Sequence, residues 1–401
     1  MAQPPGGGSV AQVFGAALQL GLTSFGGPLA HLGYFERAYV RERRWLTAEH
    51  YAALVALCQM LPGPTSSQVG LLIGLHRAGW AGALAAWIGF TLPSALLLYL
   101  AAVVAPAVGS PLELALLHGL KLVAVAVVAQ AVLTMARRLC TDRATRLIAA
   151  AAVVVLLVAA TAGAQLLVIA VAGAAGMRWC RPATAIAPPA DTVGPRTAGL
   201  ILALFVLLLL GLSLLAQHAP HGLVGLAAVF YRAGALVFGG GHVVLPLLRA
   251  LLVPDGWLAD DRFLVGYGLA QAMPGPLFAV AAYLGAVAVQ HAPLTGALVA
   301  VAAIFLPGLL LAAAGAPLAL ALARDARARA AITGVNAAVV GILAAALYDP
   351  LWRSAVHDGL DVAVVASALF LLLRAARAGL PGCVALCLAV SALRALLAPA
   401  A

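Results

Sequence analysis

A proline–glycine–proline triplet interrupts an apolar segment twice in this chain. The first triplet ends the segment Leu57-Cys-Gln-Met-Leu-Pro-Gly-Pro64, and the second ends Leu269-Ala-Gln-Ala-Met-Pro-Gly-Pro276, 212 positions later. Proline lacks a backbone N–H group and breaks or kinks a helix. In lipid, the freed backbone groups are tolerated only where they meet protein or line a cavity. The triplets therefore predict two broken helices with matching roles.

The composition places these breaks in a membrane protein. The 401 residues are 64% hydrophobic and 9% charged, against roughly 25% charged residues in a soluble domain. Apolar runs of about twenty residues, the length that crosses a bilayer as a helix, recur from end to end. We expect an all-α polytopic membrane protein with about thirteen transmembrane segments, within a range of roughly 10–13.

The two triplets belong to an internal duplication. Trp45 matches Trp257 at an offset of 212, Pro93 matches Pro307 at 214, and Lys121 matches Asn336 at 215. The Phe-Gly-Gly stretches that begin at residues 25 and 238 match at 213. The sequence predicts a first membrane domain over residues 1–177, a cytoplasmic linker over 178–198, a connecting transmembrane segment over 199–221 and a second membrane domain over 222–401.

The distribution of basic residues predicts opposite orientations for the two halves. Alternate loops counted from the N-terminus hold fifteen of the 23 Lys and Arg residues, and the opposite loops hold six. The positive-inside rule then puts the N-terminus in the cytoplasm and the C-terminus outside the cytoplasmic membrane. Inverted repeats with broken spans at matching positions are typical of secondary transporters with a site at the bilayer midplane.

The residues near the breaks predict a site for an anion. The helix after Pro64 starts with hydroxyl side chains and presents free N–H groups, and Lys121 and Arg232 are cations within spans, where an ionisable group indicates function. The mid-span segments contain no Asp or Glu. The candidate substrate-binding residues are Ser24, Phe25, Gly26, Gly27, His31, Gln59, Pro62, Gly63, Pro64, Thr65, Ser66, Gln68, Lys121, Arg232, Gly239, Gly240, Gly241, His242, Gln271, Pro274, Gly275 and Pro276.

Purely structural roles for some of these residues stay open. The side chains of Arg232 and Lys121 also suit snorkelling to the membrane interface. His31 and His242 also suit packing or interfacial positions, and the prolines Pro64 and Pro276 also suit helix hinges.

Several classes of function are disfavoured. The net charge of +10 is better explained by arginines that set orientation and meet anionic lipid than by nucleic-acid binding. The five cysteines have no paired metal-ligand spacing, and the chain has no Walker-type loop and no hydrolase or dinucleotide motif. We therefore expect no metal, no cofactor and no enzymatic activity. The expected partners are the lipid bilayer and a small anion, with a homo-oligomer left open.

The segments Ser24-Phe-Gly-Gly-Pro-Leu-Ala-His31, 57–64, Trp87-Ile-Gly-Phe-Thr-Leu-Pro-Ser94 and Phe238-Gly-Gly-Gly-His-Val-Val-Leu-Pro246 carry a resemblance to a known family. Together they resemble the chromate ion transporter (CHR) family, of the long two-domain type. The resemblance implies export of chromate, with sulfate as its structural analogue, driven by the membrane potential or a proton gradient and conferring chromate resistance. The alternatives are a transporter of sulfate or another oxyanion and, more remotely, an intramembrane enzyme.

Overall fold

In the computed structural model, every regular element of the described residues is helical. The structure describes residues 7–25, 27–104, 111–159, 161–182, 193–237, 244–315, 325–374 and 379–397. The helices of the first half are α1 (Val10–Thr23), α2 (Gly27–Phe35), α3 (Ala48–Met60), α4 (Thr65–Val104), α5 (Pro111–Leu139), α6 (Arg143–Val158) and α7 (Ala162–Trp179). The connecting helix is α8 (Pro195–Leu215). The second half has α9 (Leu223–Leu236), α10 (Val244–Leu252), α11 (Asp260–Ala272), α12 (Val280–Ala288), α13 (Pro293–Ala313), α15 (Ala326–Ala346), α16 (Arg353–Ala355), α17 (Gly359–Arg374) and α18 (Gly379–Leu397).

The two halves repeat one order of helices. Helices α1, α3 and α5 of the first half match α9, α11 and α15 of the second, and the pair α6 and α7 matches α17 and α18. Helices α3 and α11 begin and end at positions that differ by 212 residues. Helix α8 has no counterpart among the described residues. The duplication read from landmark residues is therefore repeated in the helices themselves.

The Pro-Gly-Pro triplets fall between two helices in both halves, as the sequence predicts. Helix α3 ends at Met60 and α4 begins at Thr65, and α11 ends at Ala272 before a 3-10 turn at Leu277–Ala279. With 13 residues each, α3 and α11 are about 20 Å long at 1.5 Å per residue. A bilayer core is about 30 Å thick, so neither helix crosses it alone.

A helical hairpin follows each triplet. Helix α4 reverses at Ala78 and Gly79, where Gly79 has a φ of +63° that favours glycine. The two arms pack closely, since a Cβ added at Gly74 would lie 2.3 Å from the carbonyl oxygen of Gly82. In the second half, α12 and α13 form the same hairpin, and Gly285 meets Gly296 in the same way.

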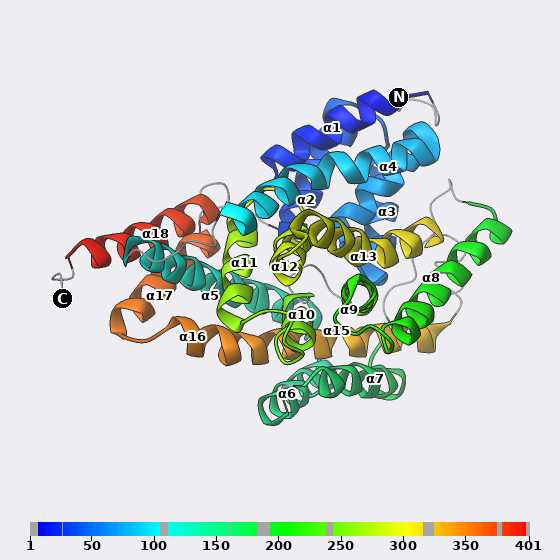
Figure 1. Ribbon diagram of the computed structural model, residues 1–401. Helices are drawn as coiled ribbons and strands as arrows, with labels where there is room; N and C mark the ends of the chain where they lie inside the picture. Colours follow the sequence, from blue (N-terminus) through cyan, green and yellow to red (C-terminus); the bar gives the residue numbers. More distant parts are fainter. Residues whose placement is uncertain are drawn as a thin grey trace.

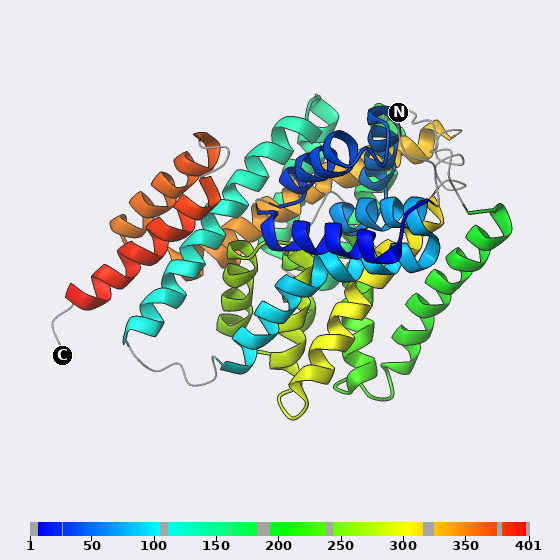
Figure 2. The same ribbon diagram turned by 90° about the horizontal axis from the view of Figure 1, so that it is seen from above.

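The two halves exchange contacts reciprocally. Helix α5 of the first half packs against α17 and α18 of the second, whereas α15 of the second half packs against α6 and α7 of the first (Figures 1 and 2). Small residues set both contacts. Gly119 of α5 lies against Cys387 and Ser391 of α18, and Gly334 of α15 lies against Gly176 of α7. The halves are therefore interleaved, and the domain limits drawn from the sequence stay predictions about the chain.

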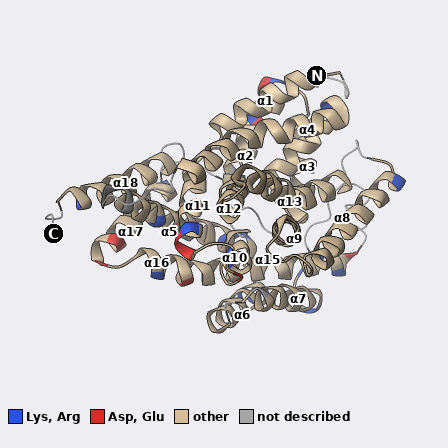
Figure 3. Cartoon of the chain, viewed as in Figure 1, with Lys and Arg blue, Asp and Glu red and all other residues tan. Residues whose placement is uncertain are grey.

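The outer surface is suited to lipid. Charged residues are sparse along the helices (Figure 3), and α8 exposes leucines over most of its length. Six helices of the described residues are long and apolar enough to cross a membrane, and four shorter apolar helices accompany them. These features confirm an all-α polytopic membrane protein. The number of spans and their directions stay predictions.

Two local details refine what the sequence predicts. The thirty-residue apolar stretch 147–176, which is too long for one comfortable span, is divided between two helices, because α6 ends at Val158 and α7 begins at Ala162. The charged stretch 36–49, whose charges alone would suggest a loop, is partly helical, because a π-helical turn covers Glu36–Glu42. Arg37 and Arg41 form ion pairs there with Glu42 and Glu36.

Candidate functional site

Each Pro-Gly-Pro triplet is hydrogen-bonded to the other half, at the residue that precedes the Phe-Gly-Gly stretch of that half. We call each of these two meeting points a crossing. The N–H of Gly63 donates to the carbonyl oxygen of Val237 at 2.7 Å, and the N–H of Gly275 donates to the carbonyl oxygen of Ser24 at 2.9 Å. Val237 and Ser24 are the last residues before the two Phe-Gly-Gly stretches. Broken backbone in a membrane protein must find partners within the protein. Here each triplet finds its partner at the end of α9 or α1 in the other half, at two crossings related by the duplication.

Both crossings need glycine. Gly63 has a φ of +120° and Gly275 a φ of +94°, in the left-handed region that favours glycine. A Cβ added at Gly63 would lie 2.7 Å from the Cα of Gly308, and one at Gly275 would lie 2.8 Å from the Oγ of Ser94. Gly308 and Ser94 each follow the proline within their own long helix, α13 or α4. The helices that contain those prolines therefore form the surface on which the opposite triplet packs.

The crossing at Gly275 is lined by hydroxyl groups of the first half. Ser24 at the end of α1 and Ser94 on α4 both lie beside Gly275, and Thr91 is one turn before Ser94. The Oγ of Ser94 donates to the carbonyl oxygen of Thr91 at 3.0 Å. The hydroxyls of Ser24 and Thr91 are buried and have no hydrogen-bond partner among the described residues. The hydrogen-bonding capacity of these two buried hydroxyls is therefore not used by any described residue.

His31 connects this crossing to the start of α4. Its Nδ1 lies 3.3 Å from the Oγ of Ser66, and its ring meets the ring of Phe90 edge-on at 5.4 Å. The His31 residue is 1% exposed. The neighbouring Ser67 is also buried, and its hydroxyl has no partner within the described part of the chain. The first turn of α4 contains no acidic residue, so its N–H groups retain the positive potential that attracts anions.

We call the residues Ser24, His31, Ser66, Ser67, Thr91 and Ser94 the polar crossing. The duplication gives five of them counterparts in the second half, at offsets of 213 for Ser24, 212 for Ser66 and Ser67, and 214 for Thr91 and Ser94. The counterparts are all without polar side chains: Val237, Phe278, Ala279, Phe305 and Gly308. The first four are buried. At these five positions, the pseudo-symmetric framework therefore carries hydroxyls in one half only.

The predicted site residues did not include Ser67, Thr91 and Ser94. A signal for them is present in the sequence, because comparing the two repeats position by position isolates the places where a hydroxyl in one half matches an apolar residue in the other. Thr65, which was predicted, fits the same pattern, since its counterpart at 212 is Leu277. Thr65 and Leu277 are both buried.

Gln68 fastens the crossing at Gly63. Its Nε2 donates to the carbonyl oxygens of Pro62 at 2.8 Å and Gly308 at 3.0 Å. It thereby ties the first triplet to α13 of the other half. The side chain is buried, and its Oε1 has no hydrogen-bond partner among the residues that the structure describes. Its counterpart, Val280, has no side-chain donor for an equivalent bond.

The two predicted intramembrane cations have different surroundings. The Nζ of Lys121 lies 2.7 Å from a carboxylate oxygen of Asp261, which the sequence places just before the second broken span. Lys121 therefore has an acidic partner from the other half, which was not expected from the sequence. Arg232 is half-buried on α9, five residues before Val237, and its Nε is buried without a hydrogen-bond partner among the described residues.

The remaining predicted site residues are divided between environments. The Oε1 of Gln59 is 3.5 Å from an Nη of exposed Arg138, whereas Gln271 is buried. Gly27 begins α2 with a φ of +77°. Phe25, Pro62, Pro64, Pro274 and Pro276 flank the two crossings along the chain. Gly26, Gly239, Gly240, Gly241 and His242 lie outside the described residues.

The polar crossing combines hydroxyls, an imidazole and the first turn of α4, it lies beside the backbone of Gly275, and it has no carboxylate among its residues. Such groups donate hydrogen bonds to a compact anion and supply none of the oxygen anions that a hard metal cation needs. This set of groups is better suited to an anion than to a cation.

Comparison with known proteins gives the same class. A family model described as Chromate transporter matches residues 11–177 and 224–394. The chromate transport protein of Pseudomonas aeruginosa is 29% identical over 355 residues, which cover 85% of this chain and 81% of that protein. The probable chromate transport protein of Synechococcus elongatus is 28% identical, with 85% and 84% covered. The chromate transport protein of Cupriavidus metallidurans is 28% identical, with 84% and 82% covered. No solved structure matches.

The family model covers both halves and leaves out the region of the linker and α8. This division agrees with the duplication found in the sequence and with the pairing of helices in the structure. The family is one of transporters, so the chain is a multi-pass membrane transporter and not an enzyme. The chain belongs to the chromate transporter family.

Proposed function

We propose that this chain exports chromate from the cytoplasm across the cytoplasmic membrane and thereby confers chromate resistance. Family membership and relatives named as chromate transport proteins support the substrate. The observation that carries the proposal is the set of buried hydroxyls of Ser24, Ser67 and Thr91 beside the broken helices, which have no partner among the described residues.

The chemistry of the polar crossing suits a tetrahedral oxyanion. Chromate is a dianion whose four oxygens accept hydrogen bonds in different directions, so donors on several elements can surround it. The polar crossing offers such donors on α1, α2 and α4, at the N-terminus of a helix. Arg232 and His31 are the basic groups we assign to balance the charge of the substrate.

The membrane potential is sufficient as a driving force for export. Moving one charge across 100 mV is worth about 2.3 kcal/mol, so about 4.6 kcal/mol is available to a dianion leaving an inside-negative cell. A proton gradient, with His31 as a carrier, is the alternative source. The proposed topology has a cytoplasmic N-terminus, an external C-terminus and two inverted halves.

Uptake of labelled chromate by everted membrane vesicles tests this function. Everted vesicles with an inside-positive potential should accumulate chromate, and collapse of the potential should stop the uptake. Thr91→Val should reduce uptake at equal amounts of inserted protein. An absence of chromate uptake by the wild-type chain would contradict the proposal.

Sulfate is the second candidate substrate. It has the same charge and tetrahedral shape as chromate, so the hydroxyls of the polar crossing can bind it with the same hydrogen bonds. Sulfate added to the same vesicles decides between the two: preference for chromate leaves chromate uptake nearly unchanged at equal sulfate, whereas a sulfate transporter takes up labelled sulfate and loses chromate uptake.

A further inference from the structure

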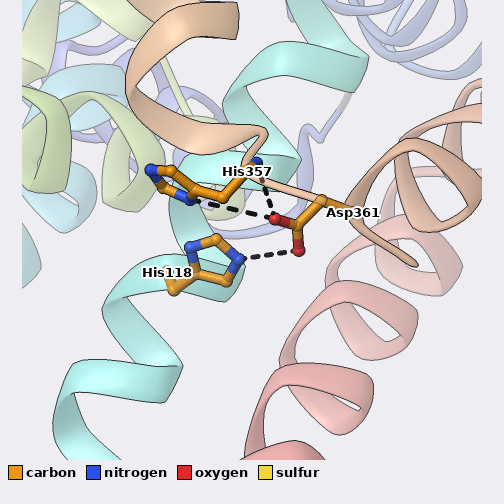
Figure 4. A group of neighbouring side chains, drawn as sticks. All are labelled: His118, His357 and Asp361. Carbon is orange, nitrogen blue, oxygen red and sulfur yellow. Dashed lines mark hydrogen bonds and ion pairs between the residues drawn. The ribbon is translucent and has the colours of Figure 1, made fainter. Parts of the chain in front are cut away.

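Two histidines and an aspartate meet on helices that are separate from the polar crossing. His118 is on α5, His357 is in the turn between α16 and α17, and Asp361 is in the first turn of α17. The Nε2 of His118 is 2.9 Å from one carboxylate oxygen of Asp361, and the Nδ1 of His357 is 3.8 Å from the other. One ligand atom from each residue lies within 4.8 Å of the other two (Figure 4).

The carboxylate is held in place by the backbone around it. Asp361 is 3% exposed, and its Oδ2 accepts the backbone N–H of His357 at 2.9 Å. The N–H of Asp361 donates in turn to the carboxylate of Asp358 at 3.0 Å, and this bond caps the N-terminus of α17. The His357 side chain is 62% exposed. One side of the group is therefore fixed and the other is open to solvent.

The three ligand atoms form a set that binds transition metals. Two imidazole nitrogens and a carboxylate oxygen bind Zn²⁺ at about 2.0–2.1 Å, usually with water in a fourth position. Tetrahedral geometry at that bond length separates the ligand atoms by about 3.3 Å. The three ligand atoms lie within 4.8 Å of one another. The two nitrogens approach different oxygens of the Asp361 carboxylate, at 2.9 and 3.8 Å, so binding through one oxygen requires the exposed His357 ring to turn toward it.

The local charge also accommodates a divalent cation. Arg394 of α18 pairs with Asp358 and lies 3.7 Å from Asp361. With neutral histidines, the two carboxylates and one guanidinium carry a net charge of −1, and a bound divalent cation changes it to +1. Arg394 keeps its ion pair with Asp358 when the metal takes the oxygen of Asp361.

Capping of the helix does not account for the histidines. The matching helix in the first half, α6, is capped in the same manner by Asp142, which accepts the N–H of Thr145 at 2.8 Å. At an offset of 216, Asp361 corresponds to Thr145 and His357 to Thr141, and at an offset of 215 His118 corresponds to Thr333. The three matched positions around the start of this helix therefore carry threonines in one copy of the repeat and two histidines and an aspartate in the other.

We propose that His118, His357 and Asp361 bind a divalent transition-metal cation such as Zn²⁺. The ion links α5 of the first half to α17 of the second, across the exchanged contact between the halves. It is separate from the oxyanion substrate and requires no transport activity to be detected.

Titration of the full-length chain with Zn²⁺ alone tests the site, using protein purified in detergent without a histidine tag. Isothermal calorimetry should detect one saturable Zn²⁺ site. A separate thermal melt should show that saturating Zn²⁺ raises the melting temperature of the protein. Loss of an outer-shell partner of a metal typically costs 10–100-fold in affinity. Removal of a ligand should therefore cost about 100-fold or more in each of His118→Ala, His357→Ala and Asp361→Asn.

His291→Ala is the control, because that side chain is exposed and outside the group, and it should leave the affinity unchanged. The His357→Ala variant keeps the test valid if the more buried substitutions impair folding, since the His357 side chain is largely exposed. The proposal is overturned if the wild-type chain binds no Zn²⁺ saturably, or if His357→Ala binds it as tightly as the wild type.

Discussion

The N–H of Gly63 donates a hydrogen bond of 2.7 Å to the carbonyl oxygen of Val237, 174 positions later in the chain. The duplication repeats this relationship between Gly275 and Ser24. Each triplet is thus fastened to the end of the first helix of the opposite half, which supplies an acceptor for the glycine N–H group that the break leaves outside a helix.

Alanine at Gly63 should destabilise the folded protein. The added Cβ would meet the Cα of Gly308 at 2.7 Å, and the φ of +120° is unfavourable for any residue with a Cβ. Strain at such a backbone position costs about 1–3 kcal/mol. A thermal melt in detergent should show a lowered midpoint for Gly63→Ala and, for the same reason, for Gly275→Ala.

Gly15→Ala is the matched control for this prediction. Gly15 lies within α1 and has no atom within 4 Å of an added Cβ, so alanine there should leave the midpoint unchanged or raise it. Equal midpoints for Gly63→Ala and wild type would show that the crossing is not close-packed.

Replacing Gln68 should destabilise the crossing at Gly63, because the Gln68 side chain holds the first triplet to α13. Gln68→Leu removes both hydrogen bonds to the carbonyls of Pro62 and Gly308. Leaving a buried polar group unsatisfied costs about 1–3 kcal/mol. We expect lower thermal stability and lower chromate uptake together. Thermal stability and chromate uptake equal to those of the wild type would show that Gln68 does not stabilise this crossing.

The ion pair between Lys121 and Asp261 can be separated from substrate binding by a charge swap. If Lys121 serves only to hold α5 to α11, the double variant Lys121→Asp/Asp261→Lys should restore the uptake that either single substitution lowers. Vesicle uptake by the two single variants and the double variant measures this. No recovery in a correctly inserted double variant would assign the lysine to the substrate path.

The duplication, the helical class and the positions of the breaks could be predicted from the sequence, because a Pro-Gly-Pro triplet cannot continue a helix through an apolar run. The exchanged contacts could not be predicted. They depend on which small residues meet, such as Gly119 with Ser391 and Gly334 with Gly176, and an apolar helix with glycines has no sequence signal that identifies its partner.

The polarity of the site was only partly predictable. The hydroxyls after Pro64 stand out in the sequence, whereas Thr91 and Ser94 look like ordinary residues near a kinked helix. Their significance depends on the opposite triplet, which brings Gly275 against Ser94. The ion pair of Lys121 with Asp261 was missed for a related reason, because a residue just before a span gives no sign that it faces a lysine of another helix.

The one-sided polarity predicts unequal effects of matched substitutions. Ser67→Ala removes a buried hydroxyl from the first turn of α4, whereas Ala279→Ser adds a hydroxyl at the counterpart position. We expect Ser67→Ala to raise the chromate concentration for half-maximal uptake and Ala279→Ser to leave it nearly unchanged. Similar effects of the two substitutions would indicate that both halves contribute equally to binding.

We propose that the polar crossing binds the transported oxyanion. The most direct measurement is chromate flux through the purified chain in proteoliposomes at a fixed membrane potential, comparing wild type, Thr91→Val and Ser213→Ala. The hydroxyl of Ser213 bonds within α8, to the carbonyl of Leu209 at 2.7 Å. A hydrogen bond to a charged group is worth about 1.5–3 kcal/mol. We therefore expect Thr91→Val to lower the apparent affinity for chromate by about 10-fold or more, while Ser213→Ala retains wild-type flux. Undiminished affinity in correctly folded Thr91→Val would show that the polar crossing does not bind the transported anion.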